Sequence, residues 1–335
     1  MKTAIAATWH AASLAILGAG AIAGAQPAAA ADSLYKGKTI KVIIRSSAGG
    51  GYDYYGRLIG RHIGRHLPGV PNVIAVNMPG AGGVVAANYL ANRAKRDGTE
   101  IGILNRGVAV AQRMKVKGVK YDVAKLIPLG SPAASSAVWV IRGNHPVKSL
   151  ADLKTHGSPI KFSTTGTGSA STQMIQVLKA DGYPVTIITG YSGMSEKVLA
   201  VVRGDVDATC CEFGTLRSHI KESDLRVLAK LGGHPDLKAY PDVRDGLSID
   251  ARALTNFMAA PLVAGRPFFT SPGVAGDRVK ALRGALKASL GDPGLVAEAK
   301  KAKRNISFTT PEEMEDVYRG ILGASDKVVE QFKKL

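Results

Sequence analysis

Residues 39–67, TIKVIIRSSAGGGYDYYGRLIGRHIGRHL, place a strand, a glycine-rich turn and a helix in direct succession. The apolar run at 39–44 predicts a buried strand, and the glycines after it predict a tight turn. Ile59, Ile63 and Leu67 then recur every four residues, which predicts an amphipathic helix. A strand that leads through a short turn into a helix is typical of a βαβ unit in a parallel sheet. The stretch therefore predicts an α/β fold.

The same succession continues along the chain. Residues 72–78 and 100–106 read as further strands, and residues 84–94 between them read as a helix. A second series starts near residue 137 and alternates strands with helices up to residue 231, with Ser149 as the expected cap of its first helix. The apolar run at 256–265 reads as one more strand, and the remainder of the chain reads as mostly helical.

Two strand–helix series without a flexible linker between them predict two lobes. We expect the chain to cross between the lobes more than once, so that one lobe is inserted into the other. The predicted first lobe comprises residues 32–136 and 260–335, and the second comprises residues 137–259. A cleft between two lobes is a preferred place for a ligand.

The N-terminus has the features of a secretory signal peptide. Lys2 supplies positive charge, and residues 12–24 form a short apolar segment. Ala29 and Ala31 satisfy the A-x-A cleavage pattern, so we expect cleavage after Ala31, with cleavage after Ala25 as the alternative. An uncleaved membrane helix is disfavoured, because the apolar segment is short and rich in Ala and Gly. The expected mature protein is exported, to the periplasm in a bacterium with two membranes.

The charge balance is strongly basic. The formal net charge is +18, from 44 Lys and Arg against 26 Asp and Glu. This bias favours an acidic ligand or partner. The basic residues are scattered, however, and no zinc finger, RNP aromatic motif or basic arm is present, which argues against nucleic acid.

The two cysteines are adjacent, at Cys210 and Cys211. Neighbouring strand residues point to opposite faces, so we expect two separate buried thiols. The alternative, a disulfide between adjacent residues, requires a strained ring. Two cysteines alone do not make a metal site, and we expect neither a metal nor a cofactor.

Four turns of similar composition are the most informative feature. Each lies between a predicted strand and the next helix, where backbone N–H groups and the positive helix end face the same edge of a sheet. Glycine lets the backbone approach a ligand closely, and nearby hydroxyls add donors. One such turn is a weak signal, but four turns on two lobes predict a cleft for an oxygen-rich anion. The turns are SSAGGGYD (46–53), NMPGAGG (77–83), TTGTGSAS (164–171) and YSGMSE (191–196).

Enzyme motifs are absent from the sequence. The GKT at 37–39 lacks the first glycine of a phosphate-binding loop, and GTGSAS at 166–171 lacks the last glycine of a dinucleotide fingerprint. His62 and His66 have metal-ligand spacing, but they lie on the arginine-rich side of the predicted helix, so we expect a solvated face. We expect no paired acid for the histidines at 145, 156, 219 and 234, and carboxylates form no convincing acid–base pair. We therefore predict that the protein is not an enzyme.

The order of these motifs resembles the substrate-binding proteins of tripartite tricarboxylate transporters, the Bug or TctC family. The segments SSAGGGYD, NMPGAGG, TTGTGSAS, GYSG, GDVDA, YPDV and PEEM occur in the family's order and cover nearly all of the expected mature chain. The resemblance implies a two-lobed fold of the type II periplasmic binding protein kind that closes around its ligand. It also implies delivery of a small carboxylated solute to a membrane permease.

The resemblance also implies which residues bind the ligand. In the family the first two turns lie on one lobe and the other two lie on the second lobe, and one ligand carboxylate is held mainly by backbone N–H groups and hydroxyls. Together with the hydroxyl of Ser47, the matching positions in the first lobe are Gly49, Gly50, Tyr52, Asp53, Pro79, Gly80, Ala81 and Gly82. In the second lobe they are Thr164, Gly166, Gly168, Ser169, Gly193 and Asp207.

The sequence departs from the family pattern in the first and third turns. Residues 45–48, Arg-Ser-Ser-Ala, stand where the family usually has apolar residues and proline, and Tyr52 replaces a small residue. Tyr52 either stacks on an aromatic acid or packs as a helix residue. Asp53 either contacts the ligand or only stabilises the start of its helix. In the third turn Thr172 replaces a histidine that is frequent in the family. These departures bear on which acid is bound.

The predicted function is therefore a monomeric receptor for a dicarboxylate, a tricarboxylate or an aromatic acid that works with a membrane permease. The alternatives are a subunit that presents the bound acid to a membrane sensor and a secreted hydrolase. A hydrolase would require a nucleophile and a base within hydrogen-bond reach.

Overall fold

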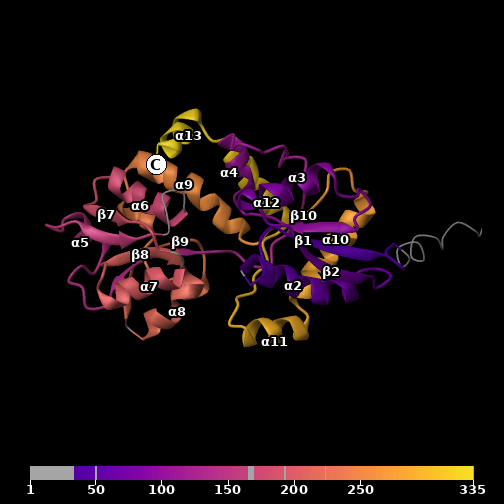
Figure 1. Cartoon of the computed structure of the whole chain (residues 1–335), viewed down its shortest axis with the longest axis horizontal. Coiled ribbons are helices and arrows are strands. Elements are labelled where there is room, and N and C mark those ends of the chain that lie inside the picture. The colour runs from indigo at the N-terminus through magenta and orange to yellow at the C-terminus, as the bar shows by residue number, and fades with distance from the viewer. Residues whose placement is uncertain (1–33, 50, 165–169, 192–193, 223, 335) are drawn as a thin grey trace, which may run out of the picture.

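The structure is a computed structural model that describes residues 34–334 except 50, 165–169, 192–193 and 223. It contains two five-stranded sheets, which lie side by side in separate lobes (Figure 1). The expected two-lobed α/β architecture is confirmed. The expected signal peptide lies outside the described residues. Among the described residues, no helix has the length and apolar character needed to span a membrane.

The first sheet has the strand order β2-β1-β3-β10-β4. β1 pairs in parallel with β2 and β3, as the strand–helix pattern predicts, whereas β10 runs antiparallel to β3 and β4. The carboxyl ends of β1, β2 and β3 therefore meet at one edge. The strands are β1 (Thr39–Ile44), β2 (Asn72–Asn77), β3 (Glu100–Ile103), β4 (Ile127–Gly130) and β10 (Phe268–Thr270).

The second sheet has the order β7-β6-β8-β5-β9. β6 pairs in parallel with β7 and β8, and β5 runs antiparallel to β8 and β9. The carboxyl ends of β6, β7 and β8 therefore share an edge as well. The strands are β5 (Ala137–Arg142), β6 (Ile160–Ser163), β7 (Val185–Ile188), β8 (Ala208–Glu212) and β9 (Leu225–Leu231).

Helices follow most strands and cover the faces of the sheets (Figure 1). Those associated with the first sheet are α2 (Gly51–Ile63), α3 (Val84–Asn92), α4 (Val108–Arg113), α10 (Gly276–Leu290), α11 (Pro293–Lys301) and α12 (Pro311–Leu322). Those associated with the second are α5 (Leu150–Lys154), α6 (Ala170–Ala180), α7 (Met194–Arg203) and α8 (Phe213–Lys221). α9 (Ile249–Ala264) and α13 (Asp326–Lys333) are the other helices of the described part of the chain. Single 3-10 turns span Gly64–His66, Ala81–Gly83, Pro235–Leu237 and Val243–Gly246.

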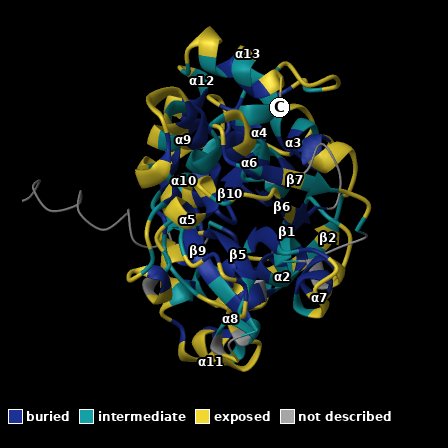
Figure 2. Cartoon of the chain, turned by 90° about the vertical axis from the view of Figure 1, so that its left-hand side faces the viewer, coloured by how far each residue is buried: buried dark blue, intermediate teal, exposed yellow. Residues whose placement is uncertain are grey.

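Both faces of the first sheet are buried. Val42 and Ile44 of β1 pack in one core with Leu58 of α2, while Ile43 points to the opposite face and joins a second core with Leu90 of α3. This arrangement explains why β1 is a continuous apolar run instead of an alternating one. Figure 2 shows the buried ribbon concentrated at the sheets, with exposed residues on the outer helices.

The strand predicted at 256–265 is wrong, because these residues lie almost entirely in α9. Ser248 caps this helix by accepting a hydrogen bond from the Ala251 N–H through its side chain. α9 packs against α6, α12 and α13, so neighbouring helices cover it on several sides. A helix covered on several sides has a continuous apolar run, which periodicity alone does not distinguish from a buried strand.

Two segments, 131–136 and 262–267, carry the chain between the sheets. They are bonded to each other: the Ser135 N–H donates to the Leu262 carbonyl at 2.9 Å, and the Arg266 N–H donates to Ser131 Oγ at 3.0 Å. Gly265 lies between them with φ of 53°, and a Cβ built there would lie 1.8 Å from the Ala133 carbonyl oxygen. The crossing is therefore closely packed at Gly265.

His62 does not lie on a solvated face as predicted. It is 6% exposed, and its Nε2 lies 3.2 Å from Glu298 of α11, while its Nδ1 lies 3.6 Å from Asp292. His66 also contacts Asp292, at 3.1 Å. The two histidines therefore connect α2 to the start of α11, a distant segment that helical periodicity within α2 does not reveal.

The prediction of two separate thiols is confirmed. Cys210 and Cys211 are both free and buried. Cys210 lies 3.7 Å from Met174 of α6, whereas Cys211 packs on the other face of the sheet, among residues that include Val198 of α7.

Candidate functional site

Asp53 holds the first turn in shape. Its carboxylate accepts hydrogen bonds from the Gly49 N–H at 3.0 Å, from Asn77 Nδ2 at 2.8 Å and from Arg57 Nε at 2.9 Å. Asn77 ends β2 and also donates to the Ser46 carbonyl, so the carboxyl ends of β1 and β2 are tied together. Burial alone would raise the pKa of Asp53, but these hydrogen bonds outweigh burial and hold the pKa below its usual value.

Tyr52 lies between two guanidinium groups. Arg45 Cζ is 4.5 Å from the centre of its ring and Arg266 Cζ is 4.7 Å from it, and both are cation–π distances. The Tyr52 hydroxyl accepts a hydrogen bond from the Arg106 N–H at 3.1 Å. Arg266 also contacts Glu212, at the end of β8 in the other sheet, at 3.3 Å. This group therefore joins the two lobes beside the first turn.

Substitution of Tyr52 should separate its two roles. Tyr52→Ala should lower the free energy of unfolding by roughly 2 kcal/mol, because it removes the ring between Arg45 and Arg266. Tyr52→Phe keeps the ring and loses the hydroxyl that accepts from the Arg106 N–H and faces Arg266, so it should lower the free energy of unfolding by about 1 kcal/mol or less. Urea unfolding followed by circular dichroism measures both values. Equal midpoints for the two variants would contradict the stacking role.

The second turn has an unusual backbone. Gly80, Ala81, Gly82 and Gly83 all have positive φ, at 136°, 45°, 65° and 103°. A positive φ is strained for Ala81, and such strain concentrates at functional sites. Positions 79–82 are exposed, and Asn105 at the end of β3 fixes the turn by donating to the Gly82 carbonyl at 2.7 Å. The turn therefore presents exposed backbone at the carboxyl edge of the first sheet.

The third and fourth turns meet at the equivalent edge of the second sheet. Thr164 follows β6 directly, its N–H donates to the Ile188 carbonyl at 2.8 Å, and its carbonyl accepts from the Tyr191 N–H at 3.4 Å. Thr164 is 0% exposed, and its Oγ1 has no hydrogen-bond partner among the described residues. The predicted site residues Gly50, Gly166, Gly168, Ser169 and Gly193 lie outside the part of the chain that the structure describes.

Asp207 is not brought together with the four turns. It precedes β8, and its carboxylate accepts a hydrogen bond from the Lys161 N–H near the start of β6 at 2.9 Å. The third turn begins at Thr164, and because Ser163 pairs with Thr209, Asp207 lies about 10 Å along β8 from the level of Thr164. By contrast, Ser47 is exposed at the end of β1, where its carbonyl accepts a hydrogen bond from Ser46 Oγ. Ser47 therefore lies with the first turn.

The charged residues around Tyr52 escape sequence reasoning. The sequence marks Arg45 only as a departure from the family pattern, and it does not single out Arg266 or Glu212. Arg266 is 8% exposed, and it lies just after the apolar residues at the end of α9. An arginine directly beside a long apolar segment is the available signal, because a buried arginine requires partners.

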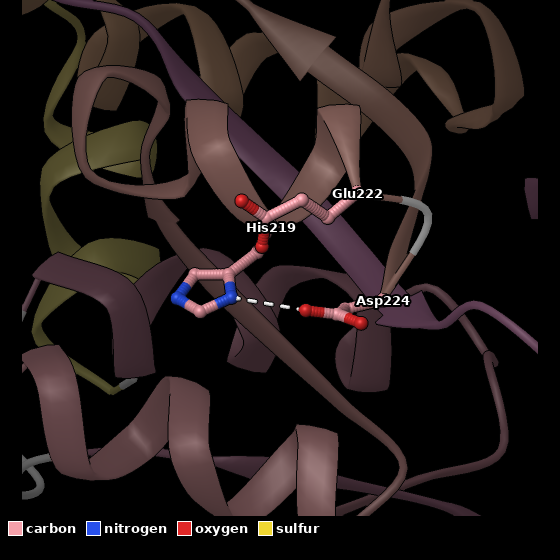
Figure 3. A group of neighbouring side chains, drawn as sticks. All are labelled: His219, Glu222 and Asp224. Carbon is pink, nitrogen blue, oxygen red and sulfur yellow. Dashed lines mark hydrogen bonds and ion pairs between the residues drawn. The ribbon is translucent and has the colours of Figure 1, made fainter.

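A separate group of potential metal ligands lies at the end of α8. His219, Glu222 and Asp224 offer ligand atoms within 4.8 Å of one another (Figure 3). His219 Nδ1 lies 3.3 Å from Asp224, which corrects the expectation that this histidine has no paired acid. All three side chains are partly or fully exposed, so the group has the character of a surface ion pair.

The sequence matches the family "Tripartite tricarboxylate transporter family receptor", TctC, over residues 63–305. The chain belongs to this family. TctC receptors are solute-binding proteins, and accordingly the chain is not an enzyme. Among curated relatives, a UPF0065 protein of Bordetella bronchiseptica is 23% identical over 249 residues, which is 72% of each chain.

Solved structures of other proteins have the same fold as this chain. A TctC solute-binding protein from Polaromonas, solved without ligand, has a TM-score of 0.73 at 18% identity and covers 90% of this chain and 100% of its own. The Rhodopseudomonas palustris protein Rpa4515, solved with adipate, has a TM-score of 0.61 at 19% identity over 88% of this chain and 97% of its own. The two-lobed TctC fold is therefore shared at low sequence identity.

Proposed function

We propose that this protein is an exported receptor that captures a small dicarboxylate or tricarboxylate for a tripartite tricarboxylate-type permease. The observation that carries the proposal is the run of positive φ angles at residues 80–83, which exposes backbone at the carboxyl edge of the first sheet. Membership of the TctC family and the adipate bound by the R. palustris neighbour support a carboxylate ligand. The basic net charge of the chain suits an anionic solute.

The proposal assigns the ligand to the space between the lobes. The first two turns would hold it from one side through residues 47–53 and 79–82, and the third and fourth turns would hold it from the other through Thr164 and its neighbours. The proposed lobes are residues 32–136 with 260–335 and residues 137–259. Export would remove residues 1–31, and the mature protein would act as a monomer in the periplasm.

Direct binding tests the proposal. Mature protein is unfolded in guanidinium, dialysed to remove bound solute and refolded, and then titrated calorimetrically with adipate, succinate, terephthalate and citrate. We expect at least one acid to bind with a dissociation constant in the micromolar range or below, and the matching dimethyl ester or amide not to bind. A correctly refolded protein that no acid binds would contradict the proposal.

The transport role is tested in the source organism. Deletion of the gene should abolish uptake of the acid identified by calorimetry, and a plasmid copy should restore it. Uptake that persists in the deletion strain, together with loss of a transcriptional response to the acid, would instead support a subunit that presents the acid to a membrane sensor.

A further inference from the structure

Lys197 is buried in the second lobe with uncharged hydrogen-bond partners. It lies on α7 and is 1% exposed. Its Nζ donates to the Cys210 carbonyl at 3.1 Å and to Ser171 Oγ at 3.2 Å. Among the ion pairs of the described residues, none includes Lys197.

The surroundings of Lys197 supply no buried countercharge among the described residues. Burial raises the pKa of both Cys210 and Cys211, so these nearby thiols are neutral. The third turn at 164–171 contains no aspartate or glutamate, and the one acid of the fourth turn, Glu196, is exposed. Burial of an ammonium group is costly unless an anion compensates it, and removal of the ion from water costs several kcal/mol even after relaxation.

The ammonium group lies at the edge of the sheet where the ligand is expected. β6 ends at Ser163, which pairs with Thr209, so Cys210 lies one residue beyond the last pair. The Cys210 carbonyl that Lys197 contacts is therefore level with the carboxyl end of β6, while β8 itself continues to Glu212. Ser171 is the second residue of α6, so the positive end of that helix faces the same place.

A second observation also indicates a ligand at this edge. Thr164 is the residue that follows β6, it is fully buried, and its Oγ1 has no hydrogen-bond partner among the described residues. A buried hydroxyl without a partner is costly and requires an explanation. A carboxylate at this edge would accept hydrogen bonds from both the Thr164 hydroxyl and the Lys197 ammonium group.

We propose that Lys197 is the ion-pair partner of one ligand carboxylate, so that the receptor selects solutes with at least two carboxylates. The first and second turns bind one carboxylate through backbone N–H groups, and Lys197 with Thr164 binds the other from the second lobe. The inference rests on the proposed function and adds the residue that determines specificity. In the absence of ligand the buried charge destabilises the lobe, and a bound dianion relieves this cost.

The test compares each diacid with its own monomethyl ester. The probes are succinate, adipate and terephthalate with their monomethyl esters, titrated into full-length mature protein. The variants are Lys197→Met, which keeps most of the side-chain volume, and Thr164→Val, which keeps the side-chain shape. Lys161→Met is the control, because Lys161 is an exposed residue of β6 and its loss changes the net charge equally.

We expect Lys197→Met to bind the preferred diacid about 100-fold more weakly, while its affinity for the monoester stays within about threefold of wild type. The same variant without ligand should unfold at a temperature equal to or above that of wild type, because a buried charge has been removed. Thr164→Val should weaken diacid binding about 10-fold without loss of stability. Lys161→Met should match wild type in every measurement.

The outcomes separate the two proposals. Wild-type protein that binds no carboxylate overturns the proposed function. A second outcome overturns only the role of Lys197: wild-type protein binds a diacid, and Lys197→Met has the same ratio of diacid to monoester affinity as wild type. If Lys197→Met does not fold, the fold requires the buried charge and the test passes to Thr164→Val. Wild-type affinity of Thr164→Val for the diacid would then overturn the inference.

Discussion

Gly265→Ala is expected to lower the free energy of unfolding by roughly 3–5 kcal/mol, a large effect for the addition of one methyl group. The new Cβ would lie 1.8 Å from the Ala133 carbonyl oxygen and 2.7 Å from the Ala134 Cα. Both neighbours are backbone atoms of the other crossing segment, so neither moves without disturbing the connection between the lobes. The positive φ of Gly265 adds strain for any residue with a side chain. Thermal unfolding followed by circular dichroism should show a midpoint roughly 8 °C or more below wild type.

Two other glycines are matched controls for this variant. Gly182→Ala retains the strain of positive φ, 84°, but has no atom within 4 Å of the new Cβ, so it should cost about 1 kcal/mol. Gly276→Ala lies in the exposed first turn of α10 with open space around it and should be neutral or slightly stabilising. A Gly265→Ala midpoint close to that of Gly182→Ala would show that the crossing segments relax freely.

Asp53→Asn is expected to cost about 2 kcal/mol at neutral pH and to weaken carboxylate binding. The amide has one neutral acceptor oxygen, so the donors from Gly49, Asn77 and Arg57 all lose a charged acceptor and at least one of them loses its acceptor altogether. The first turn then keeps the bond from Asn77 to the Ser46 carbonyl but loses part of its remaining connection to β2. Urea unfolding measures the stability, and titration with the acid identified above measures binding.

The pH dependence of this difference has a definite sign. The folded pKa of Asp53 lies below its unfolded value of about 4, so its contribution is complete above about pH 4 and is lost as pH falls through the folded pKa. The stability gap between wild type and Asp53→Asn should be constant from about pH 8 to about pH 5 and should narrow below about pH 4. Asp316→Asn is the control, because its pair with Arg319 is largely exposed. Parallel curves for wild type and Asp53→Asn down to about pH 3 would contradict this assignment.

Much of the fold could be predicted from local patterns. β1 and α2 follow from the apolar run and the four-residue period, and Ser149 caps α5 as its position before an apolar segment predicts. The errors share a physical cause. The end of α9 reads as a strand because helices pack against it on several sides, so its sequence has no continuous polar face. α8 and β10 escape prediction because their apolar patterns are short.

The candidate site could be predicted only in part. The glycine-rich turns are local in sequence, so their positions at the ends of β1, β2 and β6 follow from the pattern. The charged contacts escape prediction because they join distant segments, such as Tyr52 with Arg266, or His62 with Glu298. Lys197 does leave a signal, since it occupies the apolar face of α7 with Val198 and Val201, where a lysine is unusual.

The two buried thiols give the protein a practical use. The sequence has two cysteines, Cys210 and Cys211, and both are buried. Maleimide reagents should therefore leave the native protein unlabelled. A cysteine introduced at Ile249, which is 87% exposed at the start of α9, becomes a single attachment point for a fluorophore. The protein therefore accepts one fluorophore at a chosen position without prior removal of its own cysteines.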